Sequence, residues 1–305
     1  MADNVKVTPS SENGAVDVST DNIGGIHYPI YKAAYGVDGS ATLVSPSNPF
    51  PVIVPTPVTT LDYFIEVARG NITGATPFFG FGEHSFSGVS VNEDVWGGPT
   101  GIQPEPDTAG YALWIVSSST DDASGGNGAE VVQAHYLDTA GAEQTVSANC
   151  DGQNPVNTGV TDCMFVNEHH VISHNGTGII ATGNVDCTKG SGGAVVSRVT
   201  AAGNQSMSTM KQVPAGKELV VVGWHIYGTA STTKIANLRI RSSAHNGVLN
   251  PGVYHFHDSG RVKDSSSGRI LLEFVCPALA TVKISAWTTG TIDVTARWRG
   301  VLYDV

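Results

Sequence analysis

The chain has 305 residues, of which 40% are hydrophobic and only 14% are charged, and its formal net charge is −11. This length suits one large or two modest domains with a sizeable core. Binding to a nucleic-acid backbone needs clustered positive charge. The densest basic spots are only the pairs Arg239/Arg241 and Arg297/Arg299, so we expect no nucleic-acid partner.

Two further absences narrow the class of protein. The first residues, Met-Ala-Asp-Asn-Val-Lys, contain no apolar stretch typical of a signal peptide. No run approaches the roughly 18 apolar residues of a membrane-spanning helix, so we expect no membrane partner.

The four cysteines form no C-x-x-C pair and no zinc-like spacing. We therefore predict buried free thiols and no cofactor, with a Cys150–Cys163 disulfide left open.

Residues 1–58 are predicted to form an extended N-terminal arm. Residues 1–20 are polar, residues 26–35 resemble a short aromatic strand between glycine pairs, and five prolines follow in residues 40–59. Such a composition does not build its own core, so an ordered arm would be held against a partner. The predicted partner contacts of the arm are Ile26, Tyr28, Ile30, Tyr31 and Tyr35.

Residues 59–110 are predicted to be a connector that contains the one helix of the chain. Thr59 or Thr60 can cap this helix, and Gly70 ends it. An aromatic–glycine run follows over 77–82, which we interpret as a core edge or an interface. Residues 89–96 have the pattern of a strand.

Residues 111–305 are predicted to form a β-sandwich or jelly-roll body, because strand patterns recur about every 8–12 residues with turns between them. In the last strand Ile292, Val294, Ala296 and Trp298 alternate with polar residues, which indicates a half-buried strand. The expected strands are 111–117, 130–137, 143–148, 163–173, 178–185, 194–200, 205–212, 218–227, 235–241, 253–258, 269–275, 281–287 and 291–303.

A few residues have the chemistry of a site. His255 and His257 lie two apart, so in a strand they share one face and could bind a metal together with Asp258 or a remote carboxylate. A polar contact between subunits, or an ion on a trimer axis, explains the same pattern. The acid pairs Asp121-Asp122 and Glu93-Asp94 would suit a glycosidase only if two carboxyl groups meet in one cleft.

The N-terminal segment resembles that of tailed-bacteriophage virion structural proteins. The resemblance lies in Asp-Asn-Ile-Gly-Gly-Ile-His-Tyr-Pro at 21–29, Gly-Val-Asp-Gly at 36–39 and Asn-Pro-Phe-Pro-Val at 48–52. Shorter matches in the body include Asp-Val-Trp at 94–96, Tyr-Leu-Asp at 136–138 and Val-Pro-Ala-Gly-Lys at 213–217. In such proteins similar leading segments precede different bodies, as an attachment module would.

This resemblance implies a non-enzymatic virion protein, and we favour a capsid-surface decoration (cement) protein. Its expected partners are the major capsid protein and copies of itself in a homotrimer, and its expected place is the capsid surface after assembly in the host cytoplasm. The alternative is a tail or fibre protein that binds a host glycan, with Trp96 and Trp114 as candidate contacts. A metal-dependent or glycan-cleaving enzyme is a third hypothesis.

Overall fold

The computed structural model describes residues 63–175, 180–231, 233–264 and 266–305, and five short strands nearer the N-terminus. The chain divides into two compact units, Met1–Leu61 and Asp62–Val305. In the first unit one antiparallel sheet has the order β1-β2-β3, and β4 pairs with β5. These strands are β1 (Asp3–Val7), β2 (Val16–Ile23), β3 (Ile26–Pro29), β4 (Ala34–Tyr35) and β5 (Thr42–Leu43).

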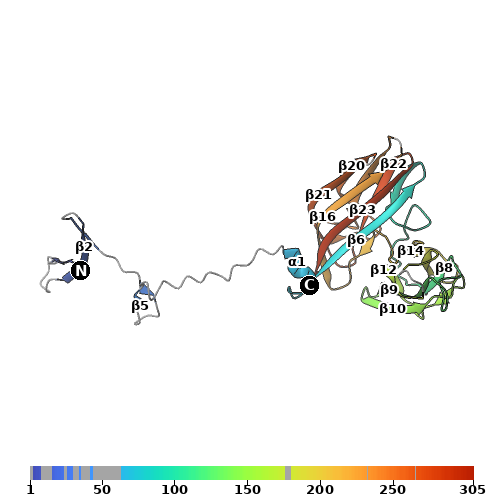
Figure 1. Ribbon diagram of the computed structural model, residues 1–305, viewed down its shortest axis with the longest axis horizontal. Coiled ribbons are helices and arrows are strands. Elements are labelled where there is room, and N and C mark those ends of the chain that lie inside the picture. The colour runs from blue at the N-terminus through green and yellow to red at the C-terminus, as the bar shows by residue number, and fades with distance from the viewer. Residues whose placement is uncertain are drawn as a thin grey trace. The chain divides into compact units, whose positions relative to one another are not determined.

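The second unit contains a β-sandwich and a smaller β lobe (Figure 1). One sandwich sheet has the order β21-β16-β23-β6; the other has the order β15-β22-β17-β20, and β7 also pairs with β22. The predicted all-β sandwich is therefore confirmed. The sandwich strands are β6 (Ala75–Phe86), β7 (Val89–Asp94), β15 (Lys211–Gln212), β16 (Lys217–Thr229), β17 (Ile235–Ser242), β20 (His255–Lys263), β21 (Ser266–Cys276), β22 (Thr281–Thr289) and β23 (Ile292–Asp304).

The lobe is formed by residues 101–210, and its two sheets have the orders β10-β9-β12 and β11-β8-β13-β14. Its strands are β8 (Leu113–Ser117), β9 (Ala129–Asp138), β10 (Glu143–Asn149), β11 (Val156–Asn157), β12 (Cys163–His174), β13 (Val185–Lys189) and β14 (Val195–Val199). A small hairpin, β18 (Ala244–His245) with β19 (Val248–Leu249), lies between β17 and β20 in the chain.

The predicted connector, 59–110, supplies the helix and two sandwich strands. The helix α1 (Tyr63–Ala68) buries Val67 against Ala75 and Val301. Among the described residues this is one short helix, and no helix there has the length and apolarity needed to cross a bilayer. β6 and β7 are integral to the sandwich sheets, so this segment contributes directly to the fold of the body.

The predicted alternation of the last strand is confirmed, and Trp298 explains the composition of its neighbour. Ile292, Val294, Ala296 and Trp298 of β23 are all about 1% exposed and belong to the sandwich core. The Trp298 indole lies where a Cβ atom on Gly80 of β6 would be, and its Nε1–H donates to Thr209 O at 2.7 Å. Because adjacent side chains in a strand point to opposite faces, glycine faces the core here and phenylalanine faces outward.

A β-bulge in β16 changes which alternate side chains of the strand face the core. The register shifts between Val221 and Gly223 against both neighbouring strands. Leu219 and Val221 are buried before the bulge, and Trp224 is buried after it. One extra residue exchanges the two faces of a strand, so the residues that follow the bulge present a different set of side chains to the surface.

The lobe has its own core, which includes three of the four cysteines. All four thiols are free and buried, so the prediction of buried free thiols is confirmed and no Cys150–Cys163 disulfide forms. Burial raises the pKa of Cys150 and of Cys163 to about 12. Thiols in this state are protonated at neutral pH and behave as small apolar side chains.

Asp122 is a buried carboxylate that organises the loops at one end of the lobe. Its Oδ1 accepts hydrogen bonds from Ala129 N and Thr182 N, both at 2.8 Å. Its Oδ2 accepts from Gly183 N at 2.8 Å and from the Ser117 hydroxyl. Asp122 is 0% exposed, and four donors from three segments of the chain compensate for its desolvation.

His169 is a second buried polar group of the lobe. Its Nε2–H donates to Val185 O at 3.0 Å, and its Nδ1 accepts from the Ser197 hydroxyl at 2.8 Å. Burial lowers the pKa of His169 to about 4. The imidazole is therefore neutral at pH 7, and protonation would remove its acceptor nitrogen.

The segment 205–212 joins the lobe to the sandwich. The Asn167 side chain accepts from Gln212 N at 2.8 Å and donates to Gln212 O at 3.0 Å. The expected strand 205–212 is limited to Lys211–Gln212, because serine hydroxyls and Thr209 supply the other polar contacts. The expected strand 178–185 is wrong over 180–184, and 178–179 lie outside the described residues; the strand here, β13, begins at Val185.

Asp122→Asn should lower the free energy of unfolding by about 2–4 kcal/mol, because its amide nitrogen would face N–H donors and would leave a buried group unsatisfied. Urea unfolding measures this change. The matched control is Asp121→Asn, whose side chain is exposed and which should change stability by less than about 0.5 kcal/mol. Equal effects of the two substitutions would contradict the structural role of Asp122.

Acid should destabilise the lobe through His169. Its pKa is about 4 when folded and about 6.5 in an unfolded chain, so its contribution is complete above pH 6.5 and is lost as the pH falls toward 4. The loss amounts to about 3 kcal/mol. Urea unfolding from pH 7.5 to 4.5 should show a shallower pH dependence for His169→Gln than for the wild type. Identical slopes would exclude His169 as the source.

Candidate functional site

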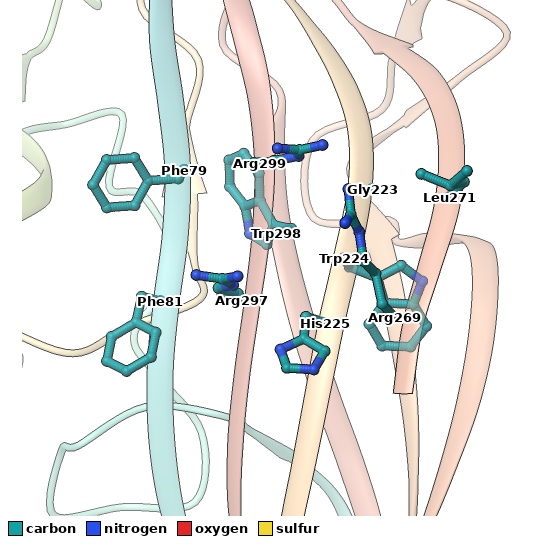
Figure 2. Close-up of a pocket in the computed structure, with 10 residues that line it drawn as sticks. All are labelled: Phe79, Phe81, Gly223, Trp224, His225, Arg269, Leu271, Arg297, Trp298 and Arg299. Atoms are coloured by element: carbon teal, nitrogen blue, oxygen red, sulfur yellow. The ribbon is translucent and has the colours of Figure 1, made fainter. Parts of the chain in front are cut away.

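The outer face of the sheet β21-β16-β23-β6 contains a groove with a volume of about 440 Å³. Figure 2 shows that side chains from all four strands line it. Its exposed apolar residues are Leu271, which is 77% exposed, Phe79, 52%, and Phe81, 38%. The lining residues are Phe79, Phe81, Gly223, Trp224, His225, Arg269, Leu271, Arg297, Trp298 and Arg299.

The sheet register places these side chains in two rows across the strands. In the first row Arg297 pairs with Phe81 on one side and with His225 on the other, and His225 pairs with Arg269. Residues directly opposite one another on a sheet face have neighbouring side chains. This row therefore brings two guanidinium groups, an imidazole and an aromatic ring onto one surface.

The second row deepens the groove. Arg299 pairs with Phe79 on β6 and with Gly223 on β16, and Gly223 pairs with Leu271 on β21. Gly223 follows the bulge and has no side chain, so the groove is open above it. The bulge and the glycine together separate Arg299 from Leu271 and leave space between them (Figure 2).

The arginines of the groove lack acidic partners. The side chains of Arg269 and Arg297 form no ion pair or hydrogen bond with any residue that the structure describes, and Arg299 Cζ lies 5.2 Å from the centre of the Phe64 ring. No Asp or Glu lines the groove. Arg198 of the lobe, by contrast, donates two hydrogen bonds to Asp186 at 2.6 and 2.7 Å. The groove thus presents positive charge that a ligand with a carboxylate, phosphate or sulfate can neutralise.

Apolar and cationic side chains alternate in this lining, which suits binding to a surface or a ligand with both kinds of group. Arginine and aromatic residues are enriched at the energetic centres of protein interfaces. The groove contains one imidazole, that of His225, and no serine, cysteine or carboxylate to act with it. Its composition supports recognition and provides no pair for nucleophilic or acid–base catalysis.

His255 and His257 lie elsewhere, on β20, and the structure separates their contacts. The His255 ring lies 4.7 Å from the His245 ring, while His257 stacks on Phe274 at 3.7 Å. His257 is the unpaired residue at a register shift in β20, between Phe256 and Asp258. His257 Nε2 also lies 2.7 Å from Ser242 Oγ, and burial lowers the pKa of His257 to about 4.

The predicted third metal ligand, Asp258, has a different partner. Asp258 accepts a hydrogen bond from Trp224 Nε1 at 3.1 Å. Across the described part of the chain, no three or more His, Cys, Asp or Glu residues gather as a metal-binding set. The structure does not bring His255, His257 and Asp258 together as ligands, and their role in a trimer stays a prediction.

The acid pairs also fail to form a two-carboxylate site. Asp121 is exposed, whereas Asp122 is saturated by its four donors. Glu93 lies 3.2 Å from His84 Nε2. Asp94 is buried and lies 3.3 Å from Lys283 Nζ, which also donates to Glu105 at 2.7 Å. Glu93 and Asp94 are adjacent in β7 and therefore face opposite ways, so they do not form one two-carboxylate site.

The two tryptophans considered for glycan binding differ in exposure. Trp96 is 1% exposed and donates to Thr100 O at 2.7 Å, so its prediction as a surface contact is wrong. The indole packs over Gly98, where a Cβ atom would overlap the ring, and is therefore not a surface contact. Trp114 is half-buried in β8.

The predicted contacts of the arm stay untested. Ile26 and Tyr28 are in β3, and Tyr35 is in β4. Ile30 and Tyr31 lie outside the described residues. The groove was not among the sites predicted from the sequence. The pairs Arg297/Arg299 and Phe79/Phe81 are each spaced two apart, and that spacing was the available signal.

No protein-family model matches the chain, and no curated protein matches it. Among solved structures, it is similar to a chain in the structure of infectious bursal disease virus, Gx strain, with 10% identity over 75% of this chain and 71% of that chain, and a TM-score of 0.22. For the Gt strain the identity is 10% over 75% of each chain, with a TM-score of 0.17. At these TM-scores we infer nothing about this chain from the likeness.

Replacing Phe79 and Phe81 by serine should change the free energy of unfolding by less than about 1 kcal/mol, because both side chains are substantially exposed. Gly80→Ala, between them, should cost about 1–3 kcal/mol because its Cβ would overlap the Trp298 indole. Thermal and urea unfolding of the three single variants measure the difference. A large loss from either phenylalanine would show a role in the fold and not at the surface.

Proposed function

We propose that the chain is a virion structural protein of a tailed bacteriophage, and more narrowly a capsid-surface decoration protein that acts without catalysis. One observation carries the proposal: the N-terminal unit is separate from an all-β body whose sheet face exposes phenylalanines and unpaired arginines. The resemblance of residues 21–52 to the leading segments of such virion proteins supports the same reading.

The mechanism of a cement protein is the burial of surface between neighbouring subunits. Stable interfaces bury about 1,200–2,000 Å² in total. In the proposed arrangement the arm, 1–58, adds strands to the major capsid protein or to a neighbouring copy, and the body contacts other copies in a homotrimer. An exposed strand edge and aromatic side chains would be covered in the assembled shell.

A second exposed face supports a bridging role. On the other sheet Val89 and Val91 are 80% and 84% exposed, and Phe256 is 56% exposed. The Arg239 guanidinium lies 4.3 Å from the Phe256 ring and 4.0 Å from the Trp287 ring. A body with apolar and cationic surface on both sheets can contact two neighbours at once, as a protein between capsid subunits must.

The groove also favours one alternative, a tail or fibre protein that binds a host glycan. Arginine recognises the carboxylate of an acidic sugar, and the Phe79 and Phe81 rings can pack on its apolar face. In this alternative the arm would attach the protein to the tail.

The deciding experiment compares the full chain with residues 62–305, which form a compact unit with their own cores. Each protein is mixed with empty phage shells, sedimented and quantified. We expect the full chain to sediment with the shells and the truncated chain to stay in solution without losing its oligomeric state. Binding of both to host envelopes, with neither on shells, would replace the decoration role by the tail role.

A further inference from the structure

Charge is distributed unevenly between the lobe and the sandwich. Residues 101–210, which form the lobe, carry 11 Asp and Glu against two Lys and Arg, a net charge of −9. Residues 75–94 and 211–305, which form the sandwich, carry 11 Lys and Arg against nine Asp and Glu, a net charge of +2. One polypeptide thus combines a strongly acidic lobe with a weakly basic sandwich.

Most of the lobe's negative charge has no basic partner in the part of the chain that the structure describes. Its two basic side chains pair with Asp107 and Asp186. The carboxylates of Asp121, Glu143 and Asp162 are exposed, and none of them forms an ion pair among the described residues. Uncompensated surface carboxylates raise the local negative potential and attract a positive surface.

The sandwich offers such a surface in the groove. Arg269 and Arg297 lack acidic partners within the described part of their own chain, although the chain as a whole has an excess of acids. The guanidinium groups stand on the strands beside Phe79, Phe81 and Leu271 (Figure 2). A partner that carries carboxylates next to apolar atoms would satisfy both kinds of side chain.

We propose that the groove is a self-association surface, occupied by the acidic lobe of a second copy of this chain. Charge complementarity within one sequence supports this occupant. The two surfaces are different, so the contact is heterologous, with the lobe of each copy bound to the groove of the next. Heterologous contacts close into rings when the rotation permits, and a trimer is such a ring. The proposal deepens the proposed function, since it identifies how copies of a decoration protein would contact each other.

The test measures the mass of the full-length protein by sedimentation in about 50 mM and about 500 mM NaCl, because screening weakens contacts between surface charges. The groove variant is Arg297→Glu with Arg299→Glu, and the lobe variant is Asp121→Lys with Glu143→Lys and Asp162→Lys. The matched control is Arg261→Glu, an exposed arginine of β20 on the other sheet. Circular dichroism and thermal unfolding check that each variant is folded.

We expect the wild type to self-associate in low salt and to dissociate in high salt. The groove and lobe variants should each associate at least about tenfold more weakly, and the control should match the wild type. An equimolar mixture of the groove and lobe variants should associate again, because each variant restores the charge pairing of the other.

Two results would overturn the proposal. The first is a wild type that stays monomeric in low salt, or a groove variant that associates as the wild type does. The second is loss of binding to a polyuronate by the groove variant with unchanged self-association, which would assign the groove to a glycan. Shell co-sedimentation is measured separately. Self-association without shell binding removes only the decoration role, and shell binding by a monomer removes only the groove contact.

Discussion

The Trp298 indole is the element on which the candidate site depends. It occupies the space beside Gly80, and its Nε1–H donates to Thr209 O at 2.7 Å, on the segment that joins the lobe to the sandwich. Because the Trp298 side chain of β23 fills this part of the core, the inward face of β6 has room only for glycine at position 80. The pleat of β6 then places Phe79 and Phe81 on the outer face, where they line the groove.

The buried charged groups have hydrogen-bond or ion-pair partners, whereas the arginines of the groove do not form ion pairs among the described residues. Asp122 accepts hydrogen bonds from four donors, and Asp94 lies close to Lys283 and Arg241. Each buried charge is compensated, as the cost of desolvation requires. The groove arginines are exposed and form no ion pair among the described residues, so ligand binding there would not have to break one. This contrast is the reason that we propose the groove as the recognition surface.

Several features of the structure support the proposed role as an assembly protein. The N-terminal segment forms a unit of its own, and the exposed faces of both sandwich sheets carry aromatic, aliphatic and arginine side chains. In the proposed self-association, the acidic lobe of one copy would bind the cationic groove of another. Proteins whose function is contact need area, complementarity and rigid scaffolds, and an all-β body with few charges provides them.

The sequence by itself determined the all-β class, the helix after residue 60, the buried free thiols and the inward face of β23, because these follow from local composition and from the two-residue period of a strand. Only the tertiary structure determined the position and the composition of the candidate site. The bulge before Gly223 exchanged the faces of β16, and strand pairing brought Arg297, His225 and Arg269 together from three separate segments. The burial of Trp96 and the turn of Asp258 toward Trp224 likewise depend on packing between distant segments, which periodicity along one strand does not specify.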